Sequence, residues 1–458
     1  MRKTLLALGM VAILLGACKK DDKNGSNNSK VDKCMYEIMS TYYLWNDMLP
    51  RYKSGENRDP EEFFYSLLYK DDVWSFCSNN ADALNGELSG SPYSMGYSPQ
   101  FWLYNDSQNV LIIVEYVYHN SPAERAGLKR GDIILLINGK SLTPDNYYDL
   151  YSAEQATLTL GVFDAATNVL DLTETTLTMS AELVTADPSY YSDVFDVNGR
   201  KVGYYVYTAF TGGTNNEYIS TMDNVFDNFK SEGVKDLIID LRYNGGGEQT
   251  AATHLASCIA PASVANENNL LIINKYNSIV DASLRNYYGS DYNKVYFEST
   301  QHNADIQNLY VLCTNGTASA SELLAVGLMP YMNVTLIGEN TYGKYTGMIE
   351  FDGSDKETED LENWAIMPIV CKYTNSVGYT DFVDGLTPDY EVEDDLLNSY
   401  EFGDPDDPMI ATALNIIGGN ALTAKAAHIR PFKYLGRNKS IIGNNLIINN
   451  LKMPAMME

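Results

Sequence analysis

The feature that most constrains the fold is a region of alternating strands and helices between about Asp187 and Asp394. Apolar runs of strand length, rich in Val, Ile, Leu and Tyr, alternate there with segments of helical length. The expected strands are residues 202–207, 237–241, 309–313 and 334–337, and the expected helices are 218–229, 248–259 and the segment after Ser319. This alternation predicts an α/β core whose ligand site lies at the carboxyl ends of the strands.

The length of the chain predicts several domains. At 458 residues it exceeds what one hydrophobic core usually supports. Helical patterns at Met35–Leu49 and Pro60–Leu68 are followed by short strands between turn residues. The expected parts are an N-terminal helical domain over 31–90, a β-rich domain over 91–184, the α/β core over 185–403, and a C-terminal helix and tail over 404–458.

The N-terminus has the organisation of an export signal. Arg2 and Lys3 precede an apolar run too short to span a bilayer, and small residues stand just before Cys18. This arrangement resembles a bacterial lipoprotein signal. The resemblance implies that residues 1–17 are removed, that Cys18 is lipidated, and that residues 18–30 tether the protein to the outer membrane, on its periplasmic or its outer face. An ordinary signal peptide with an incidental Cys18 is the alternative.

The charge of the chain excludes two classes of partner. The formal net charge is -28 at pH 7, and the sequence contains no basic patch or basic-aromatic pattern. So acidic a protein repels phosphate chains and anionic lipid alike. We therefore expect no nucleic-acid partner, and contact with a membrane through the N-terminal lipid alone.

Cysteines and histidines are scattered along the chain. The cysteines other than Cys18 form no CxxC pair and stand in apolar segments, which favours buried free thiols, although export permits a bridge. None of the 4 histidines stands in a ligand pair or beside a reactive serine. A Ser-His-Asp triad and a zinc site are therefore not expected. The residues are Cys34, Cys77, Cys258, Cys313, Cys371, His119, His254, His302 and His428.

Two residues of the core predict nucleophilic chemistry. Ser319 stands in Thr-Ala-Ser-Ala-Ser-Glu at the start of an apolar helix, and Lys344 follows it by twenty-five residues. A serine needs a base to take its proton, and a lysine can serve when burial lowers its pKa. The alternative is structural, because serine is a favoured helix N-cap and Glu322 stands where a capping box requires it.

A glycine-rich turn follows the strand expected at 237–241. It reads Asp-Leu-Arg-Tyr-Asn-Gly-Gly-Gly over residues 240–247, and its glycines let backbone amides point inward, as an oxyanion hole requires. Such a turn can also cradle a phosphate, but no Gly-Lys-Ser/Thr ending follows it. Together with the loops of Ser319 and Lys344, the turn supplies amide donors beside a nucleophile and a base.

These three motifs follow one another along the chain as the glycine turn, the Ser319 segment and Lys344. In this order they resemble the motifs of the C-terminal processing, or tail-specific, serine peptidases, which are related to the tricorn core. The resemblance covers nearly the whole chain. It includes Gly385-Leu386-Thr387-Pro388-Asp389, Tyr43-Leu44-Trp45 and Trp74-Ser75-Phe76, and also residues 121–132 and 137–140, which resemble a PDZ domain. It implies an α/β multidomain fold, in which a crotonase-like peptidase core carries a PDZ-like domain and an N-terminal helical domain.

By this resemblance, Ser319 is the nucleophile and Lys344 the general base of an endopeptidase that cleaves proteins near accessible C-termini. The groove of the PDZ-like domain would bind a substrate tail as an added strand, unless the domain packs internally and binds nothing. No metal or organic cofactor is implied. The other implied residues are the oxyanion donors Ala320 and Gly245 or Gly246, through their backbone N–H groups, and Met95, Gly96 and Tyr97 at the groove.

The chain departs from the family at one position. Many members have a glutamine four residues after the lysine to orient it, and here that residue is Met348, which leaves Thr346 and Glu350 as nearby candidates. Ser321 is a competing nucleophile, but the twenty-five-residue interval favours Ser319. The missing glutamine supports the rival hypothesis, a catalytically inactive peptide- or ligand-binding envelope lipoprotein on the same fold.

Overall fold

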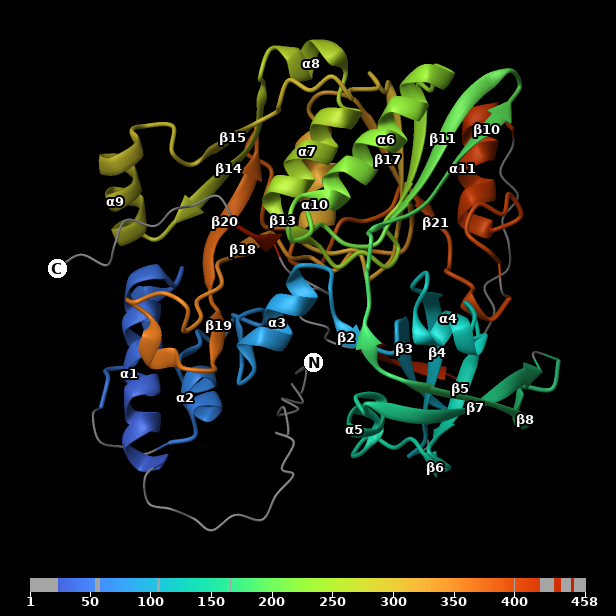
Figure 1. Ribbon diagram of the computed structural model, residues 1–458. Helices are drawn as coiled ribbons and strands as arrows, with labels where there is room; N and C mark the ends of the chain where they lie inside the picture. Colours follow the sequence, from blue (N-terminus) through green and yellow to red (C-terminus); the bar gives the residue numbers. More distant parts are fainter. Residues whose placement is uncertain are drawn as a thin grey trace.

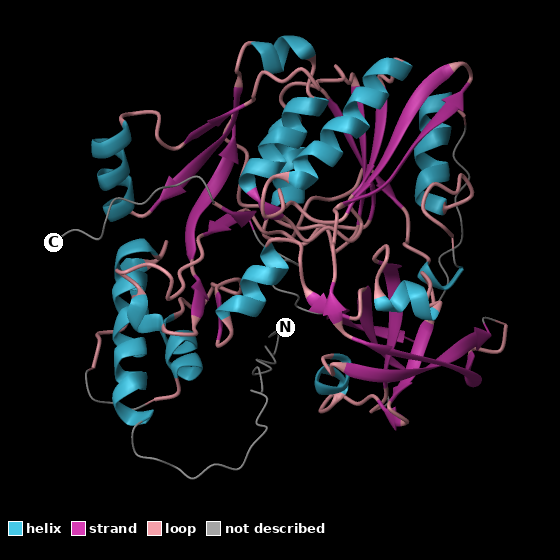
Figure 2. Cartoon of the chain, in the orientation of Figure 1, coloured by secondary structure: helices cyan, strands magenta, loops and turns pink. Residues whose placement is uncertain are grey.

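The computed structural model describes residues 24–53, 58–104, 108–164, 166–398, 400–420, 432–437 and 446–448. An α/β core carries two smaller parts, one formed by the N-terminal helices and one rich in strands (Figure 1 and Figure 2). The predicted signal peptide and Cys18 lie outside the described residues. Among the described helices, none combines the length and the apolar character needed to cross a membrane.

The core is built on a six-stranded sheet in the order β10-β11-β12-β16-β17-β21. Strands β11, β12, β16, β17 and β21 are parallel, and β10 is antiparallel to β11. The predicted alternation is confirmed, because α6 joins β11 to β12, α7 follows β12, and α10 joins β16 to β17. The bounds are β10 (Ser189–Val197), β11 (Arg200–Tyr207), α6 (Glu217–Glu232), β12 (Asp236–Asp240), α7 (Gln249–Ile259), β16 (Asn308–Cys313), α10 (Ala320–Leu328), β17 (Asn333–Gly338), β21 (Tyr390–Glu391) and α11 (Pro408–Gly418).

Successive residues of the parallel strands bury opposite faces of this sheet. Leu237 and Ile239 of β12 lie in a core that includes α6, α7 and α10, whereas Ile238 lies in a second core with Met409 and Ile410 of α11. Parallel strands covered on both faces present their carboxyl ends at one edge. The loops that leave β12, β16 and β17 therefore meet at that edge.

The N-terminal helices belong to the first of these cores. Residues of α1 (Asn24–Tyr42), α2 (Pro60–Leu67) and α3 (Ala81–Leu88) pack in one cluster with the helices of the α/β core. The predicted helical domain thus shares its hydrophobic core with the rest. Helix α1 also begins inside the segment predicted as a tether, where Asn28 donates a hydrogen bond to the carbonyl oxygen of Arg58 and anchors the added turns.

The β-rich part forms as predicted and has its own hydrophobic cluster, to which Phe101, Ile112 and Leu158 belong. Gly96 has a φ of +85°, and a Cβ atom there would lie 2.2 Å from that of Ser121, so only glycine fits. The elements are β2 (Tyr93–Ser94), β3 (Tyr97–Tyr104), β4 (Val110–Val117), α4 (Pro122–Ala126), β5 (Ile133–Ile137), β6 (Lys140–Ser141), α5 (Tyr147–Tyr151), β7 (Gln155–Asp164), β8 (Val169–Ser180) and β9 (Glu182–Leu183).

A second six-stranded sheet, in the order β13-β23-β18-β20-β14-β15, was not predicted. Most of its strands are short and come from distant segments, so local patterns do not reveal it. The C-terminal strand β23 lies between β13, which follows the glycine turn, and β18, which follows Lys344. The bounds are β13 (Gly247–Glu248), α8 (Ala262–Asn266), β14 (Leu270–Tyr276), α9 (Ser278–Tyr288), β15 (Lys294–Tyr296), β18 (Thr346–Met348), β20 (Ile369–Asn375) and β23 (Leu446–Ile447), and nearby β1 (Phe76–Ser78) pairs with β19 (Ala365–Met367).

Candidate active site

Ser319 precedes α10 in a strained backbone conformation. Its φ of 61° and ψ of -107° lie outside the regions that residues other than glycine ordinarily adopt. Two contacts hold it there: its N–H donates to Glu322 Oε2 at 2.7 Å, and its carbonyl oxygen accepts from Tyr373 O–H at 3.2 Å. The Ser319 hydroxyl oxygen is buried and has no hydrogen-bond partner among the described residues, so it is available to a base and a substrate.

Glu322 joins the loops of Ser319 and Lys344. Its buried carboxylate accepts hydrogen bonds from the N–H groups of Ser319 and Lys344 at Oε2, at 2.7 and 2.9 Å, and from Thr341 O–H and Gly343 N–H at Oε1, at 2.5 and 2.7 Å. Burial raises the pKa of Glu322 to about 7, against the effect of these donors. The residue expected to cap a helix therefore also positions the lysine loop.

Lys344 is completely buried, and this burial lowers the pKa of its ammonium group from 10.5 to about 7. The carboxylates of Asp72 and Glu322 act in the opposite direction but do not offset the loss of hydration. A substantial fraction of this lysine is therefore neutral near pH 7, as a general base requires.

The Nζ atom of Lys344 lies 3.8 Å from Sδ of Met348, which is a weak acceptor. The other two candidates, Thr346 and Glu350, carry oxygen atoms as possible acceptors. The Thr346 hydroxyl and one carboxylate oxygen of Glu350 are buried without a hydrogen-bond partner in the described part of the chain. Burial also raises the pKa of Glu350 to about 7. Of the three residues considered from the sequence, Met348 places its sulfur atom at Nζ.

Asp72 links the N-terminal helices to the site, and no pattern in the sequence indicated its role. Its carboxylate accepts hydrogen bonds from Tyr43 O–H at 2.7 Å, from Ser75 O–H at 2.6 Å, and from the N–H groups of Trp74 and Ser75 at 3.0 Å. Ser75 Oγ in turn accepts from Ile369 N–H at 2.9 Å. Residues of the Tyr-Leu-Trp and Trp-Ser-Phe motifs thus fix a negative charge near Lys344.

The glycine turn packs directly against the Ser319 loop. The carbonyl oxygen of Asn244 accepts hydrogen bonds from Ala318 N–H at 3.1 Å and from Ser321 O–H at 2.9 Å. Ser321, the competing nucleophile, is therefore buried in a structural contact that ties the two loops together. This contact agrees with the choice of Ser319 from the sequence interval.

The amides expected to form the oxyanion hole are not equivalent. Gly246 N–H donates to Asn244 Oδ1 at 2.9 Å and is already engaged. Gly245 N–H makes no hydrogen bond to a described residue, and Ala320 N–H stands in the first turn of α10, where helix geometry leaves amides unpaired. Gly245 and Ala320 are thus the better pair of donors.

The PDZ-like groove carries a strand of the chain itself. Strand β3 begins directly after Met95 and Gly96, and β22 (Phe432–Arg437) pairs antiparallel with it from Gln100 to Tyr104. The rings of Tyr147 and Tyr151 in α5 pack against Phe101 of β3. A substrate tail that adds to this edge would meet β22 there.

Arg130 connects the PDZ-like part to the glycine turn. Its guanidinium group lies 5.0 Å from the ring centre of Tyr243 and 4.6 Å from that of Phe402. It also lies 3.8 Å from Asp394, which accepts a hydrogen bond from Tyr243 O–H at 2.6 Å. Because Tyr243 belongs to the glycine turn, contacts of the PDZ-like part reach that turn directly.

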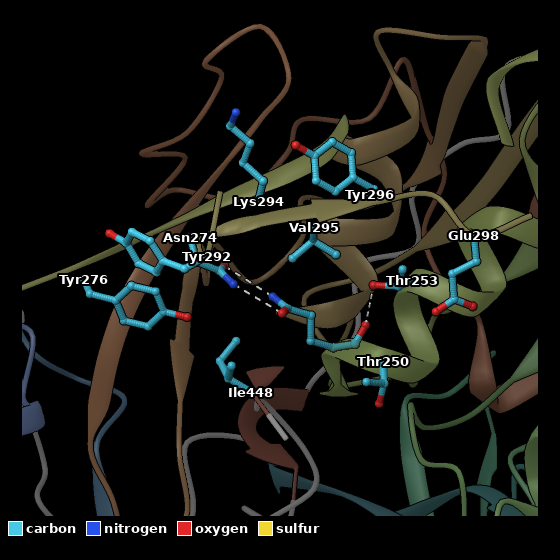
Figure 3. A pocket seen from close by; sticks show the side chains of 11 residues that line it. Thr250, Thr253, Asn274, Tyr276, Tyr292, Lys294, Val295, Tyr296, Glu298 and Ile448 are labelled. Atoms are coloured by element: carbon cyan, nitrogen blue, oxygen red, sulfur yellow. Dashed lines mark hydrogen bonds between the residues drawn. The ribbon is translucent and has the colours of Figure 1, made fainter. Parts of the chain in front are cut away.

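A cavity of about 270 Å³ opens beside α7 (Figure 3). Gln249, the first residue of α7, exchanges two amide hydrogen bonds with Asn274 across it, at 3.3 and 3.2 Å. Ile448, directly after β23, also lines the cavity. Since α7 begins directly after β13, the cavity adjoins the segment that follows the glycine turn.

The site combines a buried serine hydroxyl with a buried lysine whose pKa is lowered, which is the arrangement expected of a serine-type peptidase with a lysine base. Three family models match the chain: Peptidase family S41 at residues 201–392, the Peptidase S41 N-terminal domain at 30–76 and a PDZ domain at 113–162. The chain belongs to peptidase family S41. The predicted family is therefore confirmed.

Individual relatives agree with this assignment. The carboxyl-terminal-processing protease of Synechocystis sp. is 28% identical over 351 residues, which are 75% of this chain and 72% of the relative. The carboxy-terminal processing protease CtpA of Bacillus subtilis is 26% identical over 395 residues, 85% of this chain and 74% of the relative. A solved structure, a putative S41 protease from Bacteroides fragilis, superposes with a TM-score of 0.68 at 25% identity and covers 84% of this chain and 97% of that chain. The expected multidomain α/β fold is confirmed.

Proposed function

We propose that the protein is a serine endopeptidase that cleaves protein substrates near their C-termini, with Ser319 as nucleophile and Lys344 as general base. The observation that carries the proposal is the Glu322 carboxylate, which holds the backbone of Ser319 and of a buried lysine with a pKa of about 7 in one site. The names of the relatives and the PDZ-like part support the preference for C-termini.

In the proposed reaction, neutral Lys344 takes the hydroxyl proton of Ser319 while Oγ attacks the carbonyl carbon of the substrate. The carbonyl oxygen becomes an oxyanion, which the N–H groups of Ala320 and Gly245 and the positive end of α10 stabilise. Charged Lys344 then gives its proton to the leaving amine, and the peptide bond breaks. Water, deprotonated by the same lysine, hydrolyses the acyl-enzyme and restores Ser319.

Cleavage of an unfolded protein with a free C-terminus tests this proposal. Ser319→Ala and Lys344→Ala should each lower the cleavage rate by roughly 10³-fold or more, because nucleophile and base act as one unit. Ser299→Ala and Lys275→Ala, at exposed positions, are matched controls and should leave the rate unchanged. Amidation of the substrate C-terminus should lower kcat/KM if a free carboxylate is recognised.

The rival function, an inactive binding protein, makes a different prediction for the same assay. Wild type would then bind the unfolded protein without cleaving it, and a serine-reactive acylating probe would not label Ser319. The side chain of Met348 at the lysine is the observation that favours this rival. Labelling that requires both Ser319 and Lys344 would exclude it.

We also propose that the protein is a lipoprotein of the outer membrane, anchored through Cys18. The support is the sequence alone: a basic start, a short apolar run and small residues before the cysteine. Cys18→Ser should move the protein from the membrane fraction to the soluble fraction. Retention of the Cys18→Ser protein in membranes would contradict the proposal, and protease accessibility in intact cells would distinguish the periplasmic face from the outer one.

A further inference from the structure

Three segments distant in sequence bring metal-ligating side chains together outside the active site. One ligand atom from each of Asp223, His254 and Cys258 lies within 4.8 Å of the other two. Chain spacing does not reveal this group, because helix α6, helix α7 and the loop before β16 contribute separately. The residues of the cluster are Asp223 and Asp227 of α6, His254 and Cys258 of α7, and Glu298 and His302 of the loop.

The two imidazole rings are oriented as metal ligands are. His254 has Nδ1 at 3.2 Å from Glu298 Oε2 and Nε2 at 2.8 Å from Asp223 Oδ1. His302 repeats the arrangement, with Nδ1 at 2.9 Å from Asp227 Oδ1 and Nε2 at 3.5 Å from Asp223 Oδ2. In metal sites, a carboxylate commonly accepts the N–H opposite the ligating nitrogen and so fixes the tautomer. Both Nε2 atoms therefore converge on Asp223.

His302 lies beside the group of Asp223, His254 and Cys258 and is not part of it. Its Nε2 atom is 3.5 Å from Asp223 Oδ2 and 3.2 Å from Gln301 Nε2, so this ring contacts Asp223 from outside the group.

Cys258 completes the donor set. It lies one helical turn after His254, so the two side chains share a face of α7. The exposed fractions of the side chains are 16% for His254, 19% for His302 and 20% for Asp223, so the cluster is largely desolvated and still open to an ion from solvent. Binding would release the thiol proton, as metal coordination of cysteine does.

We propose that Asp223, His254 and Cys258 bind a divalent transition-metal ion, for which Zn²⁺ is the best match. One imidazole, one thiolate and one carboxylate are three ligands of the kinds that tetrahedral zinc takes, and a water molecule would fill the fourth position. Ca²⁺ and Mg²⁺ prefer sets of oxygen ligands and are disfavoured. The ion clamps α6 to α7 and to the loop that carries Glu298, which also lines the cavity of Figure 3.

Metal binding by the full chain tests this site independently of peptidase activity. The protein is stripped with a chelator and titrated with Zn²⁺ by calorimetry, and bound zinc is counted by elemental analysis after gel filtration. We expect one equivalent of zinc and a higher melting temperature. His254→Ala and Asp223→Ala should each abolish the tight equivalent. His119→Ala, which changes a histidine of the PDZ-like part, is the matched control and should bind zinc as wild type does.

Two further variants examine the individual roles. Glu298→Gln should weaken zinc binding by about 10- to 100-fold, because it loosens the ring of His254 without removing a ligand. With Co²⁺ in place of Zn²⁺, a thiolate-to-metal absorption band should appear in wild type and be absent from Cys258→Ser. Absence of tight zinc uptake by folded wild type, or uptake by His254→Ala and Asp223→Ala equal to that of wild type, would overturn the proposal. A Co²⁺ complex without the thiolate band would remove Cys258 from the ligand set.

Discussion

The backbone amides of Ser319 and Lys344 donate to the same oxygen atom, Oε2 of Glu322, at 2.7 and 2.9 Å. The backbone nitrogens of Ser319 and Lys344 are therefore close in space, because both lie within 2.9 Å of one oxygen atom. In the chain, twenty-five residues separate them. The other oxygen of Glu322 fixes Thr341 and Gly343. One carboxylate thus sets the position of the proposed nucleophile relative to its proposed base.

We expect Glu322→Gln to lower kcat by about 10²-fold, because an amide offers one oxygen where the carboxylate uses two, and a displacement of about 1 Å at the chemistry has an effect of this size. Each buried donor left unpaired should also lower the free energy of unfolding by about 1–3 kcal/mol. Steady-state kinetics and urea unfolding measure both effects. Glu232→Gln, at an exposed position, is the control. Unchanged kcat in Glu322→Gln would show that other contacts suffice to position the pair.

The pH dependence should follow Lys344. Because burial lowers its pKa to about 7, kcat/KM should rise as pH increases through about 7 and then level off. A flat profile between about pH 5 and 9 would contradict a lysine base with this pKa.

The free energy of unfolding should also depend on pH through the lowered pKa of Lys344. Between about pH 7 and 10.5 the unfolded chain keeps a proton on Lys344 that the folded chain has lost, so this residue makes the free energy of unfolding rise with pH across that interval. The Lys344→Met protein lacks the group, and its rise should be smaller. Glu322 acts in the opposite direction between about pH 4.5 and 7, because its folded pKa is raised. Urea unfolding of wild type and Lys344→Met at several pH values measures the difference.

Met348→Gln should increase kcat, because an amide oxygen is a stronger acceptor for Lys344 Nζ than the Met348 sulfur, which lies at 3.8 Å. The same hydrogen bond favours the charged amine, so the midpoint of the pH profile should move upward. Met348→Leu keeps the size of the side chain and removes only the sulfur, and it should stay within about threefold of wild type, since weak contacts contribute little. A loss in Met348→Leu as large as that in Lys344→Ala would show instead that the sulfur positions the base.

Weakening strand β22 should strengthen the binding of peptides with free C-termini. Tyr434 pairs with Trp102 at the edge of β3, and proline at 434 disrupts strand pairing because it lacks a backbone N–H group and fixes φ. Fluorescence anisotropy with a labelled peptide measures the dissociation constant, which should fall in Tyr434→Pro. An exposed position of the same part, Thr175→Pro in β8, serves as the control for general disruption. Equal affinity in wild type and Tyr434→Pro would show that β22 does not cover the peptide site.

The sequence predicted the convergence of the site because it follows from topology. Ser319, Lys344 and the glycine turn come after β16, β17 and β12, which are neighbouring parallel strands with aligned ends. The five cysteines within the described residues are buried free thiols, as apolar surroundings predict. These inferences needed only strand order and local composition.

Other parts of the site depend on contacts that local patterns do not encode. Glu322 was predicted from its spacing as a capping residue, but its bonds to Thr341 and Gly343 require the fold. Asp72 reaches Lys344 because the N-terminal helices share the main core, whereas composition predicted a separate domain. The approach of His254 and His302 to Asp223 likewise depends on the packing of α6 against α7 and against the loop before β16.

Lys344 acquires its low pKa only when the protein folds. In an unfolded chain this amine is hydrated and protonated, with an ordinary pKa of about 10.4, and cannot take a proton from serine. Its low pKa exists only after the N-terminal helices and the α/β core have packed into one cluster around it. In the proposed mechanism, a chain that has not yet folded therefore carries a serine without a base, and proteolytic competence arises only when folding is complete.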